Sequence, residues 1–359
     1  MNLEVFKDPK YAKGIVDYIC KIAPDSATFM EVCGTHTVSI ARNGLRDLMP
    51  AGIRLASGPG CPVCVTSNKD LDVLMALAKI DNVVITSFGD MLRVPGSTTN
   101  LLDLKAAGCS VQTVYSPLDA VKYASEHPDK EIVFAGVGFE TTTPLVAISI
   151  KRAAELGLNN FSVYSAHKNV PGALEAIVGD PEVKLDALIL PGHVSTIIGV
   201  EPYEFLAKKY GIPAVVCGFE PLDLLQGIAM ICTQIKEGRA EIENAYARAV
   251  MTKGNVYAQQ AIAEVFETAD ANWRGLGDIA DSAYVIVDKY AKFDALKKFN
   301  PCVEPTKEHA GCMCGNVLRG LIVPNECPLF RRVCNPENPV GPCMVSSEGS
   351  CAAYYRYQL

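Results

Sequence analysis

Two cysteine motifs near the start of the chain have the residue types and spacing for metal or redox chemistry. The first is Cys33 with His36, a Cys-x-x-His turn directly after the short apolar run 29–32. A thiolate and an imidazole at this spacing can hold iron, copper or zinc, or the histidine can activate the thiol as a nucleophile. A buried cysteine beside a hydrogen-bonded histidine would give the same pattern, so the pair alone is a weak signal.

The second motif is Cys61 with Cys64, a Cys-x-x-Cys that follows a Gly-Pro-Gly sequence at 58–60 and precedes a predicted helix over 68–79. The free N–H groups and the dipole at a helix N-terminus stabilise a thiolate. They therefore lower the pKa of a cysteine there and favour a reversible disulfide. The motif predicts a redox-active or metal-binding pair.

A third group of cysteines lies near the end of the chain. Seven of the fourteen cysteines fall between Cys302 and Cys351, in a segment rich in proline and glycine. Such a segment cannot build its own apolar core and needs an organising centre. Thiolates in this setting suit an iron–sulfur cluster with four cysteine ligands. Zinc is the competing occupant, but zinc sites usually show paired knuckles, and only Cys312 and Cys314 are close in sequence.

Polar side chains follow two further apolar runs. Glu140 comes after the run 132–135, and His193 comes after the run 187–190. Because the carboxyl ends of parallel strands carry the chemistry of α/β proteins, we expect both side chains to face one cleft with Cys33. The glycines before Glu140 lack the Gly-Lys-Ser/Thr ending of a phosphate loop, which disfavours a P-loop nucleotidase.

The elements that must position these residues are short strands and helices in alternation. Eight apolar runs predict strands, each separated from the next by one helix: 29–32, 53–56, 83–85, 111–115, 132–135, 161–164, 187–190 and 214–217. Parallel neighbours need such crossover connections. We predict an α/β fold with two open parallel-sheet domains plus a C-terminal Cys-rich iron–sulfur domain. The alternative is a single eight-stranded α/β barrel with a Cys-rich tail.

The predicted organisation has four parts. Residues 1–24 form an N-terminal helix packed on the C-terminal domain. Residues 25–127 form the first α/β domain, which contains Cys33, Cys61 and Cys64, and residues 128–238 form the second. Residues 239–359 form the helical and Cys-rich iron–sulfur domain, with helical pattern over 240–268.

Composition limits the function classes. The chain has 359 residues, 49% of them hydrophobic and 20% charged, as in globular proteins. A net charge of −7 without a basic block predicts binding to neither nucleic acid nor membrane. No signal-type apolar region and no run of about 18 apolar residues occurs, so we predict a cytoplasmic protein. In a reducing compartment, fourteen cysteines favour metal or redox chemistry over disulfide staples.

Six runs of the sequence together resemble the HypD family of [NiFe]-hydrogenase maturation proteins: 31–37, 58–66, 88–97, 138–144, 191–195 and 344–349. The resemblance implies a maturation factor that, with a small HypC-type partner, is a scaffold for assembling an Fe(CN)2CO unit. A HypE-type protein would donate the cyanide, and the hydrogenase large subunit would receive the iron unit. It implies an assembly scaffold with redox activity rather than a conventional turnover enzyme.

The resemblance also implies roles for single residues. Cys33 would hold the iron together with a cysteine of the HypC-type partner, and Cys61 with Cys64 would be the redox-active pair. The family's Cys-x14-Cys-x6-Cys-x16-Cys spacing for a [4Fe-4S] cluster is reproduced by Cys312, Cys327, Cys334 and Cys351, with Cys314 as an alternative first ligand. We expect His36 to orient the iron unit, to assist proton transfer or to hydrogen-bond a cyanide, and Glu140 and His193 to supply hydrogen bonds or charge.

Two other functions fit the same residues. One is a cluster-linked disulfide reductase, similar to ferredoxin:thioredoxin reductase, and the other is a passive metal-binding adaptor. A reductase needs only Cys61, Cys64 and the cluster, whereas an iron scaffold needs a third, separate thiol. Cys33 is therefore the residue that discriminates between these functions.

Overall fold

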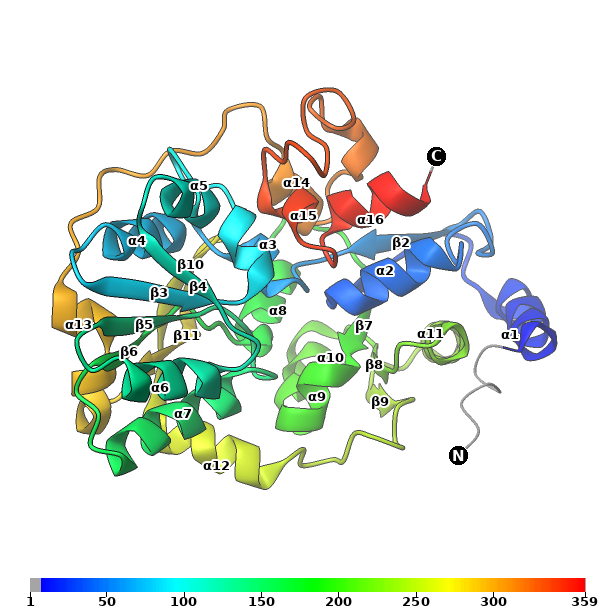
Figure 1. Ribbon diagram of the computed structural model, residues 1–359. Coiled ribbons are helices and arrows are strands. Elements are labelled where there is room, and N and C mark those ends of the chain that lie inside the picture. The colour runs from blue at the N-terminus through cyan, green and yellow to red at the C-terminus, as the bar shows by residue number, and fades with distance from the viewer. Residues whose placement is uncertain (1–7, 359) are drawn as a thin grey trace.

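The computed structural model describes residues 8–358, which form two open parallel sheets beneath a C-terminal cysteine-rich segment (Figure 1). The five-stranded sheet has the order β2-β1-β7-β8-β9, formed by Ile53–Ser57, Ala27–Glu31, Ala187–Pro191, Ala214–Cys217 and Ile242–Asn244. The four-stranded sheet has the order β4-β3-β5-β6, formed by Ser110–Thr113, Val83–Ser87, Glu131–Gly136 and Phe161–Ser165. All neighbours in both sheets are parallel.

The eight predicted strands and the α/β class with open parallel sheets are confirmed, and the alternative of a closed barrel is wrong. The predicted contiguous domains 25–127 and 128–238 do not coincide with the sheets. The chain leaves the five-stranded sheet after β2, builds all of β3 to β6, and returns at β7, which pairs with β1. An apolar run indicates that a strand is buried but not which strand lies beside it, so the sequence could not give this return.

Helices cover both faces of the sheets, as buried parallel strands require. In chain order the α-helices are α1 Pro9–Ile22, α2 Gly34–Arg42, α3 Pro62–Val65, α4 Asn68–Ala78, α5 Leu101–Ala106, α6 Pro117–Glu126, α7 Thr143–Glu155, α8 Val170–Gly179, α9 Gly192–Ile198, α10 Glu204–Tyr210, α11 Pro221–Glu237, α12 Val256–Val265, α13 Ala295–Phe299, α14 Cys314–Leu318, α15 Pro342–Val345 and α16 Ser350–Tyr357. Short 3-10 turns are η2 Gly89–Arg93, η3 Glu201–Tyr203, η4 Asp288–Phe293 and η5 Pro324–Glu326. In residues 8–358 none of these helices has the length and apolar character needed to cross a bilayer.

The N-terminal helix does not pack where the sequence analysis placed it. Helix α1 lies against α11, and Ile19 joins a buried cluster with Leu225 and Ile228 beside the five-stranded sheet (Figure 1). The amphipathic pattern of α1 requires an apolar partner but does not specify which one. The predicted apolar positions Val5 and Phe6 lie outside the described residues.

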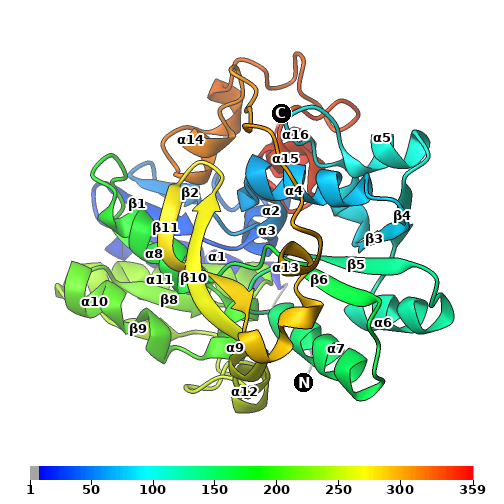
Figure 2. The same ribbon diagram turned by 90° about the vertical axis from the view of Figure 1, so that its left-hand side faces the viewer.

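The predicted helical stretch 240–268 is mostly wrong. Only α12 is helical there, and an antiparallel hairpin follows it, formed by β10 (Phe266–Trp273) and β11 (Gly277–Ile286) (Figure 2). The hairpin is anchored by Trp273, whose Nε1 donates to Ser282 Oγ at 2.8 Å. Its turn reaches α3 and α14, where Gly275 approaches Gly315.

The cysteine-rich end of the chain begins with an extended segment over 301–313 and continues through short helices (Figure 2). Its helices α15 and α16 pack on α3 and α2. Cys314, Cys334, Cys343 and Cys351 share one buried cluster with Met30 and Leu188 of the five-stranded sheet. The segment is therefore packed onto the first sheet rather than around a separate apolar core.

Replacing Gly60 should disturb the junction of the loops after β1 and β2. A Cβ at Gly60 would lie 2.1 Å from the backbone N of Cys33, so the main chain must move. We expect Gly60→Ala to lower the free energy of unfolding by at least about 1–3 kcal/mol, the usual cost of overpacking. The matched control is Gly14→Ala in α1, where nothing lies within 4 Å of the new Cβ. It should be neutral or stabilise by about 0.5–1 kcal/mol. Equal urea midpoints for both variants would contradict this account.

Candidate functional site

The loops that follow β1 and β2 bring Cys33 and Cys61 to the same edge of the five-stranded sheet. The two strands are parallel neighbours, with Glu31 opposite Ser57 in the register. Cys33 is the N-cap of α2 and Cys61 is the N-cap of α3. The backbone N–H of Gly34 donates to the carbonyl of Gly60 at 3.0 Å, so the two loops are in direct contact. The two cysteine motifs therefore lie side by side at this edge of the sheet.

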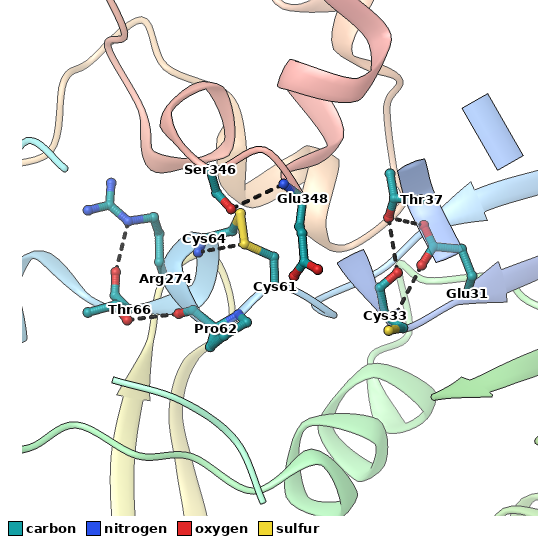
Figure 3. The surroundings of a disulfide bond; sticks show 10 residues. All are labelled: Glu31, Cys33, Thr37, Cys61, Pro62, Cys64, Thr66, Arg274, Ser346 and Glu348. Atoms are coloured by element: carbon teal, nitrogen blue, oxygen red, sulfur yellow. Dashed lines mark hydrogen bonds between the residues drawn. A yellow bond between two sulfur atoms is a disulfide. The ribbon is translucent and has the colours of Figure 1, made fainter. Parts of the chain in front are cut away.

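Cys61 and Cys64 are joined by a disulfide across the first turn of α3, with Cα atoms 5.2 Å apart (Figure 3). Both side chains are buried, and the backbone N–H of Cys64 points at Cys61 Sγ, 3.2 Å away. A hydrogen bond from a backbone N–H to this sulfur would stabilise it as a thiolate once the disulfide is reduced. Cycling between disulfide and dithiol stays a prediction.

Cys33 lines a cavity of about 360 Å³ at the carboxyl edge of the sheets, which we call the Cys33 cavity. Residues from five loops form its wall, including Cys33, Thr35, Gly60, Phe139, His193 and Glu348. The predicted convergence of loops on one cleft therefore holds for Cys33 and His193.

The Cys33 thiol is only 7% exposed. Burial is the main cause that raises its pKa to about 12, and the carboxylates of Glu31 and Glu348 act in the same direction. The backbone N–H groups of His36 and Thr35, at the start of α2, oppose this rise. At neutral pH the thiol is thus protonated, and a cation that binds its sulfur must displace the proton.

Glu31, the last residue of β1, positions the Cys33 loop. Its Oε2 accepts the backbone N–H of Cys33 at 3.0 Å and its Oε1 accepts the hydroxyl of Thr37 at 2.5 Å. Burial raises the pKa of Glu31 to about 7, although these hydrogen bonds lower it. Glu31 was not among the predicted site residues. The available signal was a carboxylate at the end of an otherwise apolar strand.

The two predicted histidines both contact the Phe219 ring. His193 stacks on Phe219 with ring centroids 3.8 Å apart, and His36 lies 5.0 Å away on a tilted ring. The Nε2 of His36 is 2.9 Å from the carbonyl of Gly218, so this nitrogen carries the proton. Burial lowers the pKa of His36 to about 4. His36 is not among the residues that line the Cys33 cavity, whereas His193 is.

Glu140 does not line the Cys33 cavity, contrary to the sequence-based expectation. Its side chain is 1% exposed, and its Oε1 accepts the backbone N–H of Val170 at the start of α8 at 3.0 Å. Burial raises its pKa to about 7. Its sequence neighbours Phe139 and Thr141 line the cavity instead. The loop was predicted correctly, but the spacing could not tell which side chain points inward.

Glu348 supplies the carboxylate that was expected from Glu140. Thr35 donates its hydroxyl to Glu348 Oε1 at 2.8 Å, and both residues line the Cys33 cavity. A Cβ at Gly34 would lie 2.6 Å from the Cβ of Glu348, so the glycine is what admits this segment. Glu348 lies in the run 344–349 that carries part of the resemblance to the HypD family, but no role was predicted for its carboxylate.

Five cysteines of the C-terminal segment line one small pocket, which we call the cysteine pocket: Cys312, Cys314, Cys327, Cys334 and Cys351. Cys343 is not part of this lining, although its thiol contacts those of Cys314 and Cys351. Within residues 8–358 no group of three or more histidine, cysteine or acidic side chains is arranged for a single metal ion.

The cysteine pocket has the donor set of an iron–sulfur cluster. Its remaining lining is apolar or backbone, so thiolates are the only anionic ligands it offers. A Cβ at Gly341 would lie 2.6 Å from Cys314 Sγ and 2.8 Å from Cys312 Sγ, so the glycine leaves room against both sulfurs. The residues fit the group, and both Cys312 and Cys314 remain candidates for the first ligand.

A family model named HypD and described as "Hydrogenase formation hypA family" matches residues 10–358. The chain belongs to the HypD family. The match covers both sheets and the cysteine-rich segment, so the Cys33 cavity and the cysteine pocket both lie inside the region that the HypD family model describes.

Curated relatives agree with this family. The hydrogenase maturation factor HypD of Rhodobacter capsulatus is 47% identical, over 98% of this chain and 97% of the relative. The proteins of that name from Rhizobium leguminosarum bv. viciae and Cupriavidus necator are 44% and 43% identical. The first match covers 99% of this chain and 95% of the relative, and the second 99% and 96%.

Glu140 should make the stability of the protein depend on pH. Its folded-state pKa, about 7, lies above the ordinary value of 4.5. Between these values the folded protein holds a proton that the unfolded chain lacks, so the free energy of unfolding falls as pH rises and levels off above about pH 7. Glu140→Gln removes this loss. The variant should gain up to about 3 kcal/mol over the wild type between pH 4.5 and 8.

Urea unfolding at pH 5, 6, 7 and 8 measures this difference. The control is Glu201→Gln, which changes an exposed carboxylate and should run parallel to the wild type. If the free energy of unfolding of Glu140→Gln also runs parallel to that of the wild type across this pH range, burial does not raise the pKa of Glu140.

Proposed function

We propose that this chain acts in [NiFe]-hydrogenase maturation as a scaffold that holds an Fe(CN)2CO unit on Cys33 during its assembly. Family membership and the names of the curated relatives support the maturation role. The observation that carries the scaffold role is a free thiol in a cavity, separate from the neighbouring disulfide. We expect the protein to act in the cytoplasm with a HypC-type partner, a HypE-type cyanide donor and, at delivery, the hydrogenase large subunit.

Cys33 would bind the iron through its sulfur. A low-spin iron with carbonyl and cyanide ligands prefers soft donors such as thiolate. Because the free thiol is protonated at neutral pH, its proton must leave as the iron–sulfur bond forms. His193 lines the same cavity, and burial lowers its pKa, so it is neutral and able to accept that proton. A cysteine of the HypC-type partner would be the second protein ligand of the iron.

The other polar groups of the Cys33 cavity suit the cyanide ends of the unit. Cyanide nitrogens accept hydrogen bonds, and a protonated His193 is a donor on the cavity wall, whereas the Thr35 hydroxyl already donates to Glu348. His36 is not expected to donate to a ligand. Its Nε2–H donates to the Gly218 carbonyl, and its ring packs against Phe219.

Electrons would come through the cysteines. A [4Fe-4S] cluster held by Cys327, Cys334, Cys351 and either Cys312 or Cys314 would supply single electrons. Reduction of the Cys61–Cys64 disulfide takes two electrons and two protons and yields two thiols beside the Cys33 loop. Helix α3, which carries this pair, packs against α15 of the cysteine-rich segment.

The disulfide reductase is the second candidate function. It is favoured by the position of Cys61 and Cys64 in the same buried cluster as Cys314 and Cys343. It gives no role to Cys33, so the effect of removing that thiol separates the two functions.

Removing the Cys33 thiol should abolish iron-unit binding without unfolding the protein. Cys33→Ser replaces a soft donor by a hard, protonated one. When the variant is copurified with its HypC-type partner, the infrared CO and CN stretching bands should be lost while the visible absorbance of the cluster stays. Cys20→Ser, which changes an exposed free cysteine, is the control and should keep all bands. Bands of wild-type intensity in Cys33→Ser would favour the reductase or adaptor function.

The cysteine pocket should bind a cluster of about four irons and give the purified protein a brown colour. Cys327→Ser should lose most of this iron and absorbance, whereas Cys109→Ser, far from the pocket in sequence, should keep both. Comparing Cys312→Ser with Cys314→Ser identifies the first ligand, because only the true ligand's loss reduces the iron content strongly. Stoichiometric zinc without visible absorbance in the wild type would refute the cluster.

A further inference from the structure

Arg274 is a buried cation in the turn between β10 and β11. It is 6% exposed, and its backbone N–H donates to the carbonyl of Val65 at 2.9 Å. Its Nε donates to the carbonyl of Thr66 at 3.1 Å (Figure 3). Its Nη2 donates to Asn68 Oδ1. The guanidinium is thus fixed at the end of the helix that carries the disulfide.

All of these partners are neutral oxygens. Within residues 8–358 no carboxylate forms an ion pair with Arg274, although burying an unpaired charge costs several kcal/mol. A second buried cation at the same hairpin is treated differently. Lys168 is 3% exposed and pairs with Asp70 at 3.2 Å. The fold therefore neutralises one buried cation with a carboxylate and leaves the other for a different anion.

The nearest candidates for that anion are the thiolates of the cysteine pocket. Arg274, Cys312 and Cys314 line one cavity of about 370 Å³. Gly275, which follows Arg274, is in backbone contact with Gly315, which follows Cys314. A Cβ at Gly275 would lie 2.3 Å from the Cα of Gly315. This contact fixes Arg274 relative to Cys314.

Arg274 is the buried cation among the residues that line this cavity. The ammonium group of Lys307 on the cavity rim is exposed and screened by water, as are the carboxylates of Asp103 and Glu308.

We propose that Arg274 is a positioning residue that supplies the counter-charge for the thiolate-bound cluster of the cysteine pocket and thereby sets its reduction potential. The inference rests on the cluster that the proposed function assigns to this pocket. A cluster with four thiolates carries net negative charge, and one added electron makes it more negative. A fixed cation in a low-dielectric site favours the reduced form and raises the potential.

Redox titration of the purified holoprotein, followed by visible absorbance and electron paramagnetic resonance, tests this role. Arg274→Met removes the charge and should make the midpoint potential more negative, by roughly tenfold in the reduction equilibrium, or about 59 mV for one electron. Arg274→Lys keeps the charge and should stay closer to the wild type. Lys307→Gln removes an exposed charge from the same cavity and is the control, with little expected change.

A second variant tests the charge without removing the guanidinium. Asn68→Asp places a carboxylate at the atom that already accepts from Arg274, in the first turn of α4, where acidic residues are tolerated. It should shift the potential in the same direction as Arg274→Met, and it decides the matter if Arg274→Met does not fold or load iron.

The outcomes separate this inference from the proposed function. Equal potentials in the wild type, Arg274→Met and Asn68→Asp, all loaded with iron, would overturn the role of Arg274 and leave the cluster standing. Zinc instead of iron in the wild-type protein would overturn the cluster itself, and the inference with it.

Discussion

The site depends on two glycines, Gly60 and Gly34, because each allows another segment of the chain to approach more closely than a Cβ would permit. At Gly60 a Cβ would collide with the backbone of Cys33, and at Gly34 it would collide with Glu348. These contacts join the loop after β1, the loop after β2 and the C-terminal segment at one edge of the five-stranded sheet. Because β1 and β2 are parallel, the loops that follow them emerge at the same edge of the sheet, and the glycines allow these loops to come into contact. The free thiol and the disulfide are neighbours for this reason.

The β10–β11 hairpin makes the second connection, between the disulfide and the cysteine pocket. Thr66, two residues after Cys64, forms a bridge with Trp273, and Gly275 packs on Gly315, next to Cys314. The hairpin also holds both buried cations of this region, Arg274 directly and Lys168 through the carbonyl of Asn272. A long strand pair is stiffer than a loop, so it suits the task of fixing the distance between the disulfide and the cysteine pocket.

The sequence predicted the strands and the cysteine motifs well, but it predicted poorly which strands are neighbours in the sheets. Runs such as Ile132–Ala135 are buried on both faces and give a clear signal, and a Cys-x-x-Cys after Gly-Pro-Gly is specific. The return of the chain from β6 to β7 depends on contacts between residues far apart in sequence, such as Phe29 with Ala187. Strand β10 was missed because the residues between Phe266 and Trp273 are mostly small or acidic and lack a clear alternation. His36 and Glu140 were placed in the correct loops, but the direction of each side chain is set by tertiary partners, the Gly218 carbonyl and the Val170 N–H.

The high pKa of Cys33 has a consequence for a thiol beside a disulfide. Thiol–disulfide exchange needs the thiolate, and burial raises the pKa of Cys33 so far that the thiol is almost entirely protonated at pH 7. Burial therefore keeps Cys33 from attacking the Cys61–Cys64 bond, although the two loops are hydrogen-bonded to each other. A soft cation reverses the preference, since it replaces the proton and stabilises the sulfur as thiolate. The desolvation that keeps the Cys33 thiol protonated therefore allows the two sulfur sites to lie side by side without reacting with each other.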